Sequence, residues 1–351
     1  MPCAERRHFV QTPYLQADSY RTDTVVLTPG SILQSRYRVI CQLGEGGMGT
    51  VYEAIDQRFE CRVAVKEARF TEEGLRKQFE REARLLYTLR HPAITRVIDH
   101  FSEEHGQFLV MDYVEGEDLG AALRSRAGGF SIGQVLDWGD QLLDALHYLH
   151  SHDPQIIHRD IKPQNLKISK MGRVILLDFG LAKTYALPAQ DISSSVFGYT
   201  PNYAPLEQIQ GTGTDSRSDL YSLGATLYHL MTGTVPVDVL ARLTATTDRR
   251  PDPLLNVNEL NSEIPVEVAS VLRKALAIGR SDRSRTAVEF RKALREADPR
   301  RKPPMLAMCR LQHANLNRGK NRLPLGLFRF STRSAHWNKQ VSSRHTSELY
   351  C

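Results

Sequence analysis

The stretch that decides the fold is IIHRDIKPQNLKISKMGRVILLDFG, residues 156–180. Two short apolar runs in it flank a turn at 170–172, which is the pattern of a β-hairpin. Asn165 comes directly before the hairpin, and Asp178 follows its second run. The two ends of a hairpin lie close together, and amide and carboxylate oxygens suit a hard cation such as Mg²⁺. The stretch therefore predicts a metal site at the open end of a hairpin.

A third polar side chain of this stretch, Asp160, lies five residues before Asn165. If Asn165 and Asp178 hold a cation, Asp160 is available to act on a substrate hydroxyl. Each of these residues alone could equally belong to a solvated surface loop. The three together favour an active site.

Length and composition indicate a globular protein with room for two lobes. The chain has 351 residues, and this length exceeds the usual size of one domain. With 41% hydrophobic and 25% charged residues, its composition supports a sizeable core. Its five cysteines are scattered and show no CxxC spacing. This argues against a disulfide framework or a zinc site and fits a reducing compartment.

No targeting segment is evident in the sequence. Residues 1–16 lack the apolar run of a signal peptide. No stretch approaches the roughly 20 apolar residues that cross a bilayer. We expect no membrane span and a cytoplasmic location.

The positive charge belongs to the C-terminal tail. Residues 299–351 contain eleven Lys or Arg and one acid, Glu348, so they carry +10, and the remaining residues carry −4 of the total +6. The tail has no periodic apolar face, which predicts disorder over 298–351. Such a tail could attract an acidic partner or nucleic acid; the alternative is a solvated terminus without a specific partner.

Residues 1–36 show no clear period and are predicted to form a loose arm. The next residues, 37–42, alternate as a strand and lead into a glycine-rich GxGxxG formed by Gly44, Gly46 and Gly49. Glycines at these points let the backbone close over phosphate groups. A tight hairpin turn is the alternative for the motif alone. A dinucleotide-binding loop would lead into a helix, whereas this one leads into a strand at 50–55.

Lys66 ends the apolar strand 62–66, either as an exposed lysine or as a phosphate-binding one held by an acid. A charged helix over 72–89 follows, with an apolar face made of Phe79, Ala83, Leu86 and Leu89. Glu82 lies beside that face and could reach Lys66. Two further strands are expected within 91–116, so the first lobe is predicted to be mostly antiparallel sheet with one main helix.

The second lobe is predicted to be mainly helical. Residues 131–151 place apolar side chains at three- and four-residue spacing, and similar patterns recur at 216–232, 265–277 and 286–297. A cleft between a sheet-rich and a helix-rich lobe is a natural ligand site.

With these motifs in place, residues 37–297 resemble a eukaryotic-type (Hanks-type) protein kinase domain, most similar to the bacterial serine/threonine kinases. The matching pieces occur in family order: LGEGGMGTV, VAVK, Glu82 in REARLL, HRDIKPQN, DFG, and SDLYSLG at 218–224. The resemblance implies an α+β bilobal kinase fold, with an N-lobe at 37–115 and a C-lobe at 116–297.

The resemblance implies roles for the polar residues. Asp160 would accept or orient the proton of the substrate hydroxyl, and Lys162 would steady the γ-phosphate of ATP. Asn165 and Asp178 would bind Mg²⁺, with Mn²⁺ as an alternative, and Lys66 paired with Glu82 would hold the α- and β-phosphates. Met111 would be the gatekeeper before a hinge at 112–114. The residues implied for ATP binding are Leu43, Gly44, Glu45, Gly46, Gly47, Met48, Gly49, Val51, Ala64, Lys66, Asp112 and Val114.

The form HRDIKPQN and Thr200, which would contact Asp160 and Lys162, resemble kinases that phosphorylate Ser and Thr hydroxyls of proteins. In such kinases the arginine at the position of Arg159 pairs with a phosphate on the activation segment. Ser193, Ser194 and Ser195 are the candidates for that phosphate; the alternative is an unmodified flexible loop.

Two positions depart from the family pattern. The usual Ala-Pro-Glu reads Pro205-Leu206-Glu207, and Tyr199 replaces the glycine before Thr200. Glu207 keeps the acid, and Arg283 is the expected partner. Both departures bear on substrate preference more than on catalysis.

Two other function classes compete with an active protein kinase. A pseudokinase scaffold would act by binding alone, but it would not need the full set of polar residues. A small-molecule kinase of related fold is less consistent with Lys162 and the segment through Glu207. Phosphate transfer from ATP to a protein substrate separates the three.

Overall fold

The computed structural model describes residues 27–46, 49–68, 73–103, 106–178 and 200–301. Several predicted features lie outside the described residues: the arm 1–26, Gly47 and Met48 of the glycine-rich loop, Tyr199, the serines Ser193, Ser194 and Ser195, and the tail from residue 302 on.

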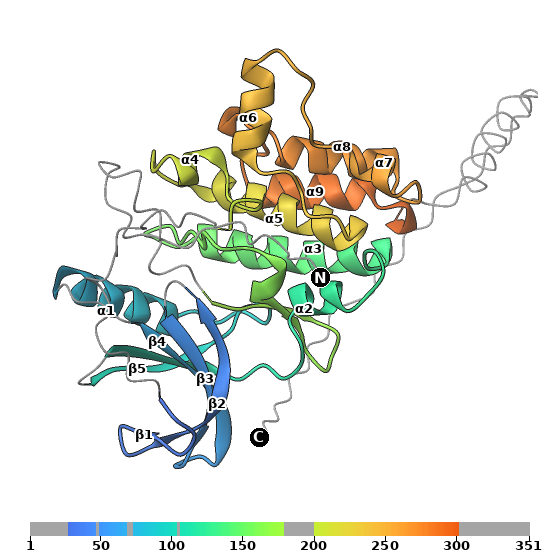
Figure 1. Cartoon of the computed structure of the whole chain (residues 1–351). Coiled ribbons are helices and arrows are strands. Elements are labelled where there is room, and N and C mark those ends of the chain that lie inside the picture. Colours follow the sequence, from blue (N-terminus) through green and yellow to red (C-terminus); the bar gives the residue numbers. More distant parts are fainter. Residues whose placement is uncertain (1–26, 47–48, 69–72, 104–105, 179–199, 302–351) are drawn as a thin grey trace, which may run out of the picture. The chain divides into compact units, whose positions relative to one another are not determined.

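The N-terminal part is an antiparallel sheet with strand order β1-β2-β3-β4-β6-β5. Helix α1 (Glu73–Tyr87) comes between β4 and β5 in the chain, packs on β5 and lies beside the sheet in Figure 1. The strands are β1 (Ile32–Leu33), β2 (Tyr37–Gly46), β3 (Gly49–Asp56), β4 (Cys61–Ala68), β5 (Val97–Glu103) and β6 (Gly106–Asp112). The predicted sheet with one main helix is confirmed.

Each face of this sheet buries a different core. Tyr52, Val65 and Phe108 lie in a cluster confined to the sheet. Ala64 and Met111, opposite each other on β4 and β6, belong to the larger core that includes helix α1. The four apolar residues predicted for a helix over 72–89, Phe79, Ala83, Leu86 and Leu89, are all buried, although α1 ends at Tyr87 and Leu89 lies just beyond it. Alternation along the strands therefore divides the side chains between the two cores.

The prediction of a loose arm up to residue 36 is wrong for 27–36. Strand β1 pairs with β2, with Leu33 opposite Tyr37, and the Leu33 side chain is buried. Arg36 donates to both carboxylate oxygens of Asp56 at 2.9 and 2.6 Å. A two-residue strand is too short to show a period, so its pairing partner decides its conformation.

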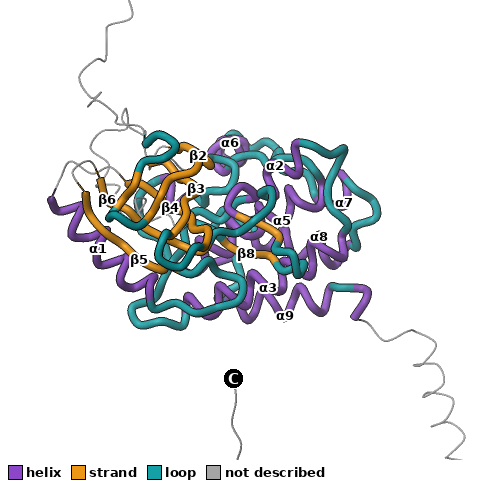
Figure 2. Tube along the Cα trace, turned by 90° about the horizontal axis from the view of Figure 1, so that it is seen from below, coloured by secondary structure: helices purple, strands orange, loops and turns teal. Residues whose placement is uncertain are grey.

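The remaining described residues are mainly helical, as predicted (Figure 2). The helices are α2 (Leu119–Arg124), α3 (Ile132–His150), α4 (Leu206–Ile209), α5 (Ser216–Thr232), α6 (Val239–Thr247), α7 (Val257–Leu260), α8 (Val266–Ala275) and α9 (Ala287–Ala297). Short 3₁₀ turns lie at Pro163–Asn165, Arg280–Asp282 and Pro299–Arg301.

Helix ends follow from capping side chains. Ser131 accepts from Gln134 N at the start of α3, and Thr286 accepts from Glu289 N at the start of α9. Asp215 and Ser218 form a capping box that begins α5, and Gly233 ends that helix at φ 71°. The four long predicted helices are confirmed. Helices α2, α4, α6 and α7 are not predicted from the sequence, because they are too short for a clear period.

The prediction of disorder from residue 298 on is wrong for residues 298–301. Pro299–Arg301 form a 3₁₀ turn, and Arg300 bonds Asp298 and, from the neighbouring helix α3, Asp137 at 2.8 Å. These bonds raise the pKa of Arg300. Two acids thus hold the first basic residues of the tail on the helical part.

The predicted hairpin is confirmed as β7 (Leu166–Ile168) and β8 (Val174–Leu176), with Leu166 opposite Leu176. Its second strand also bonds the segment before β5, through Thr95 N to Leu176 O at 3.0 Å. The hairpin is thereby tied to the N-terminal part. Among the described residues no helix combines the length and apolarity that a membrane span requires.

Candidate active site

The hairpin brings Asn165 and Asp178 to one end, as predicted. The backbone N–H of Leu177, the residue before Asp178, donates to Asn165 O at 2.8 Å. The Asn165 amide donates through Nδ2 to the backbone oxygen and to Oδ2 of Asp160, at 2.7 and 2.9 Å. The predicted acid Asp160 is therefore held against the predicted metal-binding amide.

Lys162 approaches the same carboxylate. Its Nζ lies 3.1 Å from Asp160 Oδ2 and donates to Thr200 Oγ1 at 3.2 Å. The predicted contact of Thr200 with Lys162 is confirmed. A cation, a carboxylate and a hydroxyl thus meet at the point where a substrate hydroxyl is expected to react.

Lys66 is buried and ion-paired with Asp178. This pair connects β4 to the end of the hairpin. Glu82 lies on helix α1 and is partly buried. Its predicted pairing with Lys66 stays a prediction.

His158 fixes the loop that carries Asp160. It is buried, its Nδ1 lies 3.3 Å from the Asp160 N–H, and its Nε2 lies 3.1 Å from Leu177 O. Burial lowers its pKa although the acids Asp219 and Asp160 oppose the shift. A neutral ring with the proton on Nε2 satisfies both bonds, because Nδ1 then accepts and Nε2 donates.

Asp219 of α5 anchors the backbone of this loop. It has no exposed surface and accepts bonds from His150 Nε2, the His158 N–H and the Arg159 N–H, each at 2.9 Å. Burial opposes its ionisation, but His150 first, and then His158, hold the pKa of Asp219 below its usual value.

Two residues of the site adopt left-handed backbone conformations that favour glycine. Arg159 has φ 64° and Asp178 has φ 39°. Such positions cost on the order of 1–3 kcal/mol and persist where the surroundings impose them. Here the bonds of Asp219 to the loop and of Leu177 to Asn165 impose them.

The side chain of Arg159 points to the segment before α5, where its Nε donates to Thr214 Oγ1 at 2.8 Å. The serines predicted to carry its phosphate lie outside the described residues. Its regulatory role stays a prediction.

The predicted pair of Glu207 with Arg283 is confirmed. Arg283 donates to Glu207 Oε1 and Oε2 at 2.7 and 3.2 Å, and both side chains are buried. Ser218 adds a bond to Oε1 at 2.8 Å. Burial opposes ionisation of Glu207, but Arg283 holds its pKa below the usual value. Pro205, one place before the departure at Leu206, caps the start of α4.

The structure requires glycine at position 49 of the glycine-rich loop but not at position 44. Gly49 has φ 132°, and a Cβ there would lie 1.8 Å from Glu67 O, so the packing of β3 on β4 excludes any other residue. A Cβ on Gly44 would meet no described atom within 4 Å. The described residues therefore do not demand glycine at 44, and its predicted role over nucleotide phosphates stays a prediction.

Strands β3, β4 and β6 bring the other predicted nucleotide residues near one another. Val51 lies opposite Lys66, Ala64 opposite Met111, and Val63 opposite Asp112. Val114 follows two residues after β6. Leu43 and Glu45 are exposed on β2, and Gly46 ends that strand.

The residues present fit a divalent cation with bound phosphate groups. The Asn165 amide uses its Nδ2 on Asp160, which leaves its Oδ1 as the oxygen donor, and Asp178 supplies a carboxylate. Mg²⁺ usually takes one or two protein oxygens and completes its shell with water and phosphate. The described residues hold no cluster of three or more His, Cys, Asp or Glu that would bind a metal unaided. Two protein oxygens are within what Mg²⁺ usually takes, so Asn165 and Asp178 suit a cation that also binds phosphate.

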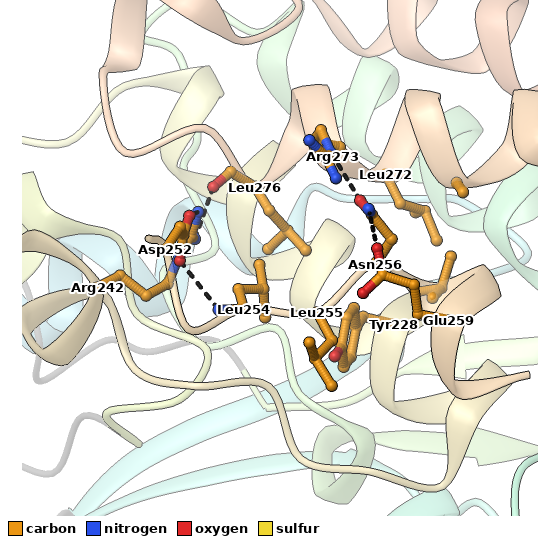
Figure 3. A pocket seen from close by; sticks show the side chains of 12 residues that line it. Tyr228, Arg242, Asp252, Leu254, Leu255, Asn256, Glu259, Leu272, Arg273 and Leu276 are labelled. Atoms are coloured by element: carbon orange, nitrogen blue, oxygen red, sulfur yellow. Dashed lines mark hydrogen bonds and ion pairs between the residues drawn. The ribbon is translucent and has the colours of Figure 1, made fainter. Parts of the chain in front are cut away.

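A separate pocket of about 310 Å³ lies among α5, α6, α7 and α8. Figure 3 shows that bonded pairs form much of its polar wall, such as Arg242 with Asp252 and Arg273 with Asn256. None of the predicted site residues lines it, so it is not the candidate active site.

Comparison with known proteins identifies the class. The model of the protein kinase domain family matches residues 37–313. This covers well over half of the chain, so the chain belongs to the protein kinase domain family. The bilobal kinase fold predicted from the sequence is confirmed.

Particular relatives are bacterial serine/threonine-protein kinases. The chain is 40% identical over 225 residues to pkn2 of Myxococcus xanthus, covering 61% of this chain and 26% of pkn2. It is 31% identical over 271 residues to PrkC of Bacillus subtilis, covering 76% of this chain and 41% of PrkC. The chain thus spans less than half the length of these relatives.

The crystal structure of the Mycobacterium tuberculosis PknI kinase domain is similar, with a TM-score of 0.61 and 27% identity. The match covers 78% of this chain and 99% of that kinase domain.

Asp219 and His158 had no predicted role, although they lie in the motifs SDLYSLG and HRDIKPQN. The signal for Asp219 was a lone acid within an apolar helix. Such a residue is rarely buried unless it has partners.

Proposed function

We propose that this chain is a serine/threonine protein kinase that transfers the γ-phosphate of ATP to Ser or Thr hydroxyls of proteins. The observation that carries the proposal is the contact of Asp160 with both Asn165 and Lys162, next to the Lys66–Asp178 pair. Lys66 and Asp178 meet from positions 112 apart in the sequence, whereas Asp160, Lys162, Asn165 and Asp178 all belong to the 156–180 stretch.

The reaction makes one bond and breaks one. The substrate hydroxyl oxygen attacks the γ-phosphorus, the bond from that phosphorus to the bridging oxygen of ADP breaks, and the hydroxyl proton passes to Asp160. Asp160 lies beside the Lys162 ammonium, which would neutralise charge on the transferred group. Lys66 would bind the phosphates of the nucleotide that remain on ADP.

A divalent cation, Mg²⁺ or Mn²⁺, held by Asn165 and Asp178 would neutralise phosphate charge. The fixed amide of Asn165 and the position of Asp178 at the hairpin end support this assignment. Lys66 contacts Asp178 in this structure, so nucleotide phosphates would compete with Asp178 for the Lys66 ammonium.

Ser and Thr acceptors are supported by the Lys162–Thr200 bond, which lies beside Asp160. The relatives pkn2 and PrkC are named serine/threonine-protein kinases. Protein substrates, a cytoplasmic location and the domain limits 37–297 belong to the same proposal. A partner for the basic tail stays a prediction.

The deciding experiment is transfer of radiolabelled phosphate from ATP to a generic protein substrate in Mg²⁺ and in Mn²⁺, with Asp160→Asn as control. We expect transfer by the wild type and at least about a hundredfold less by the variant. Nucleotide binding without transfer would favour a scaffold. Transfer only to a small-molecule hydroxyl would favour a small-molecule kinase of related fold.

Activation by phosphorylation of Ser193, Ser194 or Ser195 is part of the proposal. Arg159 would supply the cation that binds the phosphate. Intact-mass measurement and peptide mapping of active protein should find phosphate there, at a stoichiometry that falls in Asp160→Asn. Fully active protein without phosphate on this segment would contradict the regulatory role.

A further inference from the structure

Gln208 of helix α4 bonds the loop that carries Asp160. Its Nε2 donates to the backbone oxygen of Arg159, 49 positions earlier in the chain, at 2.9 Å. The preceding residue, Glu207, belongs to the buried pair with Arg283, so this short helix is itself fixed. The Gln208 amide therefore reaches the loop from a rigid support.

The bond falls on the peptide group that joins Arg159 to Asp160. At one end of that group the Arg159 oxygen accepts from Gln208. At the other end the Asp160 N–H donates to His158 Nδ1 at 3.3 Å. Because a peptide group is planar, partners at both of these atoms fix how the whole group is turned. The orientation of this group sets the direction in which the Asp160 side chain leaves the backbone.

The restraint acts where the backbone would otherwise relax. Arg159 has φ 64°, a left-handed conformation that persists only where the surroundings impose it. Asp219 holds the Arg159 N–H at 2.9 Å, whereas Gln208 holds the Arg159 oxygen. The two bonds act on opposite sides of the Arg159 Cα, so neither makes the other redundant.

The other atom of the Gln208 amide argues against a role in stability alone. Its Oε1 is buried and has no hydrogen-bond partner among the described residues. A buried acceptor without a partner costs stability, which offsets what the Nε2 bond contributes. A methionine of similar length would remove both atoms, so the amide is explained by the peptide group that it holds.

We propose that Gln208 is a positioning residue for Asp160: by holding the peptide group before Asp160, it keeps that carboxylate turned toward the substrate hydroxyl. The inference rests on the proposed function in taking Asp160 as the group that receives the hydroxyl proton. Gln208 itself contacts neither nucleotide nor substrate, so its loss should lower kcat and leave the KM for ATP unchanged.

The first test is steady-state phosphate transfer by the full chain, with Gln208→Met compared with Gln210→Met. Gln210 is the matched control because it is exposed and ends the same helix. In Gln208→Met we expect kcat to fall at least about fivefold, because small misplacements of a catalytic group are costly, with the KM for ATP within about twofold of the wild type. Gln210→Met should keep the wild-type kcat. Unchanged kcat in Gln208→Met, or equal losses in the two variants, would overturn the proposal.

A second measurement separates positioning of Asp160 from a general loosening of the fold. In Asp160→Asn the proton acceptor is already absent, so adding Gln208→Met should lower the residual rate by less than about twofold. The melting temperature of Gln208→Met should stay within about 3 °C of the wild type. The same several-fold loss of rate with and without Asp160 would mean that Gln208 does not act through Asp160, and would overturn the proposal.

Hydrogen exchange tests the hold on the loop without any assay of activity. Measured by mass spectrometry on peptides that cover residues 156–165, exchange should be at least about fivefold faster in Gln208→Met than in the wild type, and unchanged in Gln210→Met. Unchanged exchange in Gln208→Met would overturn the positioning role, whatever the rate of transfer. Faster exchange combined with no transfer by the wild type would overturn the proposed function and support the hold of Gln208 on the loop.

Discussion

Two polar clusters in this molecule differ in how many of their hydrogen-bonding and charged groups have partners within the protein. Around Asp219, Glu207 and Arg283 the charged side chains are almost wholly buried, and every bond partner is a fixed protein group. Around Asp178 and Lys162 the side chains keep 31% and 19% of their surface exposed. The first cluster is bonded throughout by protein, whereas the second leaves oxygen and ammonium groups open to a ligand.

The difference indicates that one cluster fixes the backbone of the site and the other is available to a ligand. A buried, saturated carboxylate such as Asp219 fixes a backbone, because moving it would leave charges without partners. A partly exposed one such as Asp178 can exchange a protein partner for a substrate. The rigid cluster holds the loop, and the open cluster carries the proposed chemistry.

The largest effect that would test this division is on catalysis. Asp160→Asn should lower phosphate transfer at least about a hundredfold, because the amide cannot take the hydroxyl proton. The melting temperature should change little, since the amide keeps the size of the side chain. Radiolabel transfer and a thermal melt measure the two. A variant that retains near-normal rate would refute the role of Asp160.

Breaking the rigid cluster should instead cost stability. Arg283→Met leaves Glu207 buried without its main cation, and we expect a loss of about 3–5 kcal/mol in the free energy of unfolding. Urea titration measures it. Arg280→Met is the matched control, because Arg280 is partly exposed and lies 3.9 Å from Glu207; it should cost under about 1 kcal/mol. Equal losses would contradict the comparison.

Acid should weaken the rigid cluster gradually. Burial lowers the pKa of His158, which lies in the loop that Asp219 anchors, below 6.5, so the unfolded chain takes up a proton first as the pH falls below that value. The stabilisation is complete above pH 6.5 and declines by up to about 1.4 kcal/mol per pH unit per histidine below it. Urea titrations from pH 7.5 to 5.5 measure this. Stability that rises on acidification would contradict it.

The smallest expected effect on phosphate transfer is that of Thr200, which bonds Lys162. Thr200→Val removes the bond to Lys162 and should lower transfer several-fold, consistent with about 1 kcal/mol for one hydrogen bond. Thr200→Ser keeps the hydroxyl and should stay near the wild-type rate. Equal rates for Thr200→Val and the wild type would remove Thr200 from the site.

Much of the fold was predictable because the long elements carry their own signals. The strands at 37–42 and 50–55 and the helices at 131–151 and 216–232 lie where alternation and periodicity placed them. The short elements β1, α4 and α7 have too few residues for a period. Packing against longer elements decides them, which is why residues 27–36 were wrongly predicted to be loose.

The sequence by itself determined which residues could do the chemistry. The order of the glycine-rich loop, Lys66, Glu82, the 156–180 stretch and residues 218–224 carried the family resemblance, and that resemblance implied Arg283 as the partner of Glu207. Only the tertiary structure decided how these residues are held. Asp219 can anchor the loop only because the fold brings three donors to it. Likewise, Lys167 bonds the Val114 carbonyl oxygen 53 positions away only because the fold brings the two segments together. Residue type fixes what a side chain can donate or accept, but its partner is decided by which segments the fold brings together.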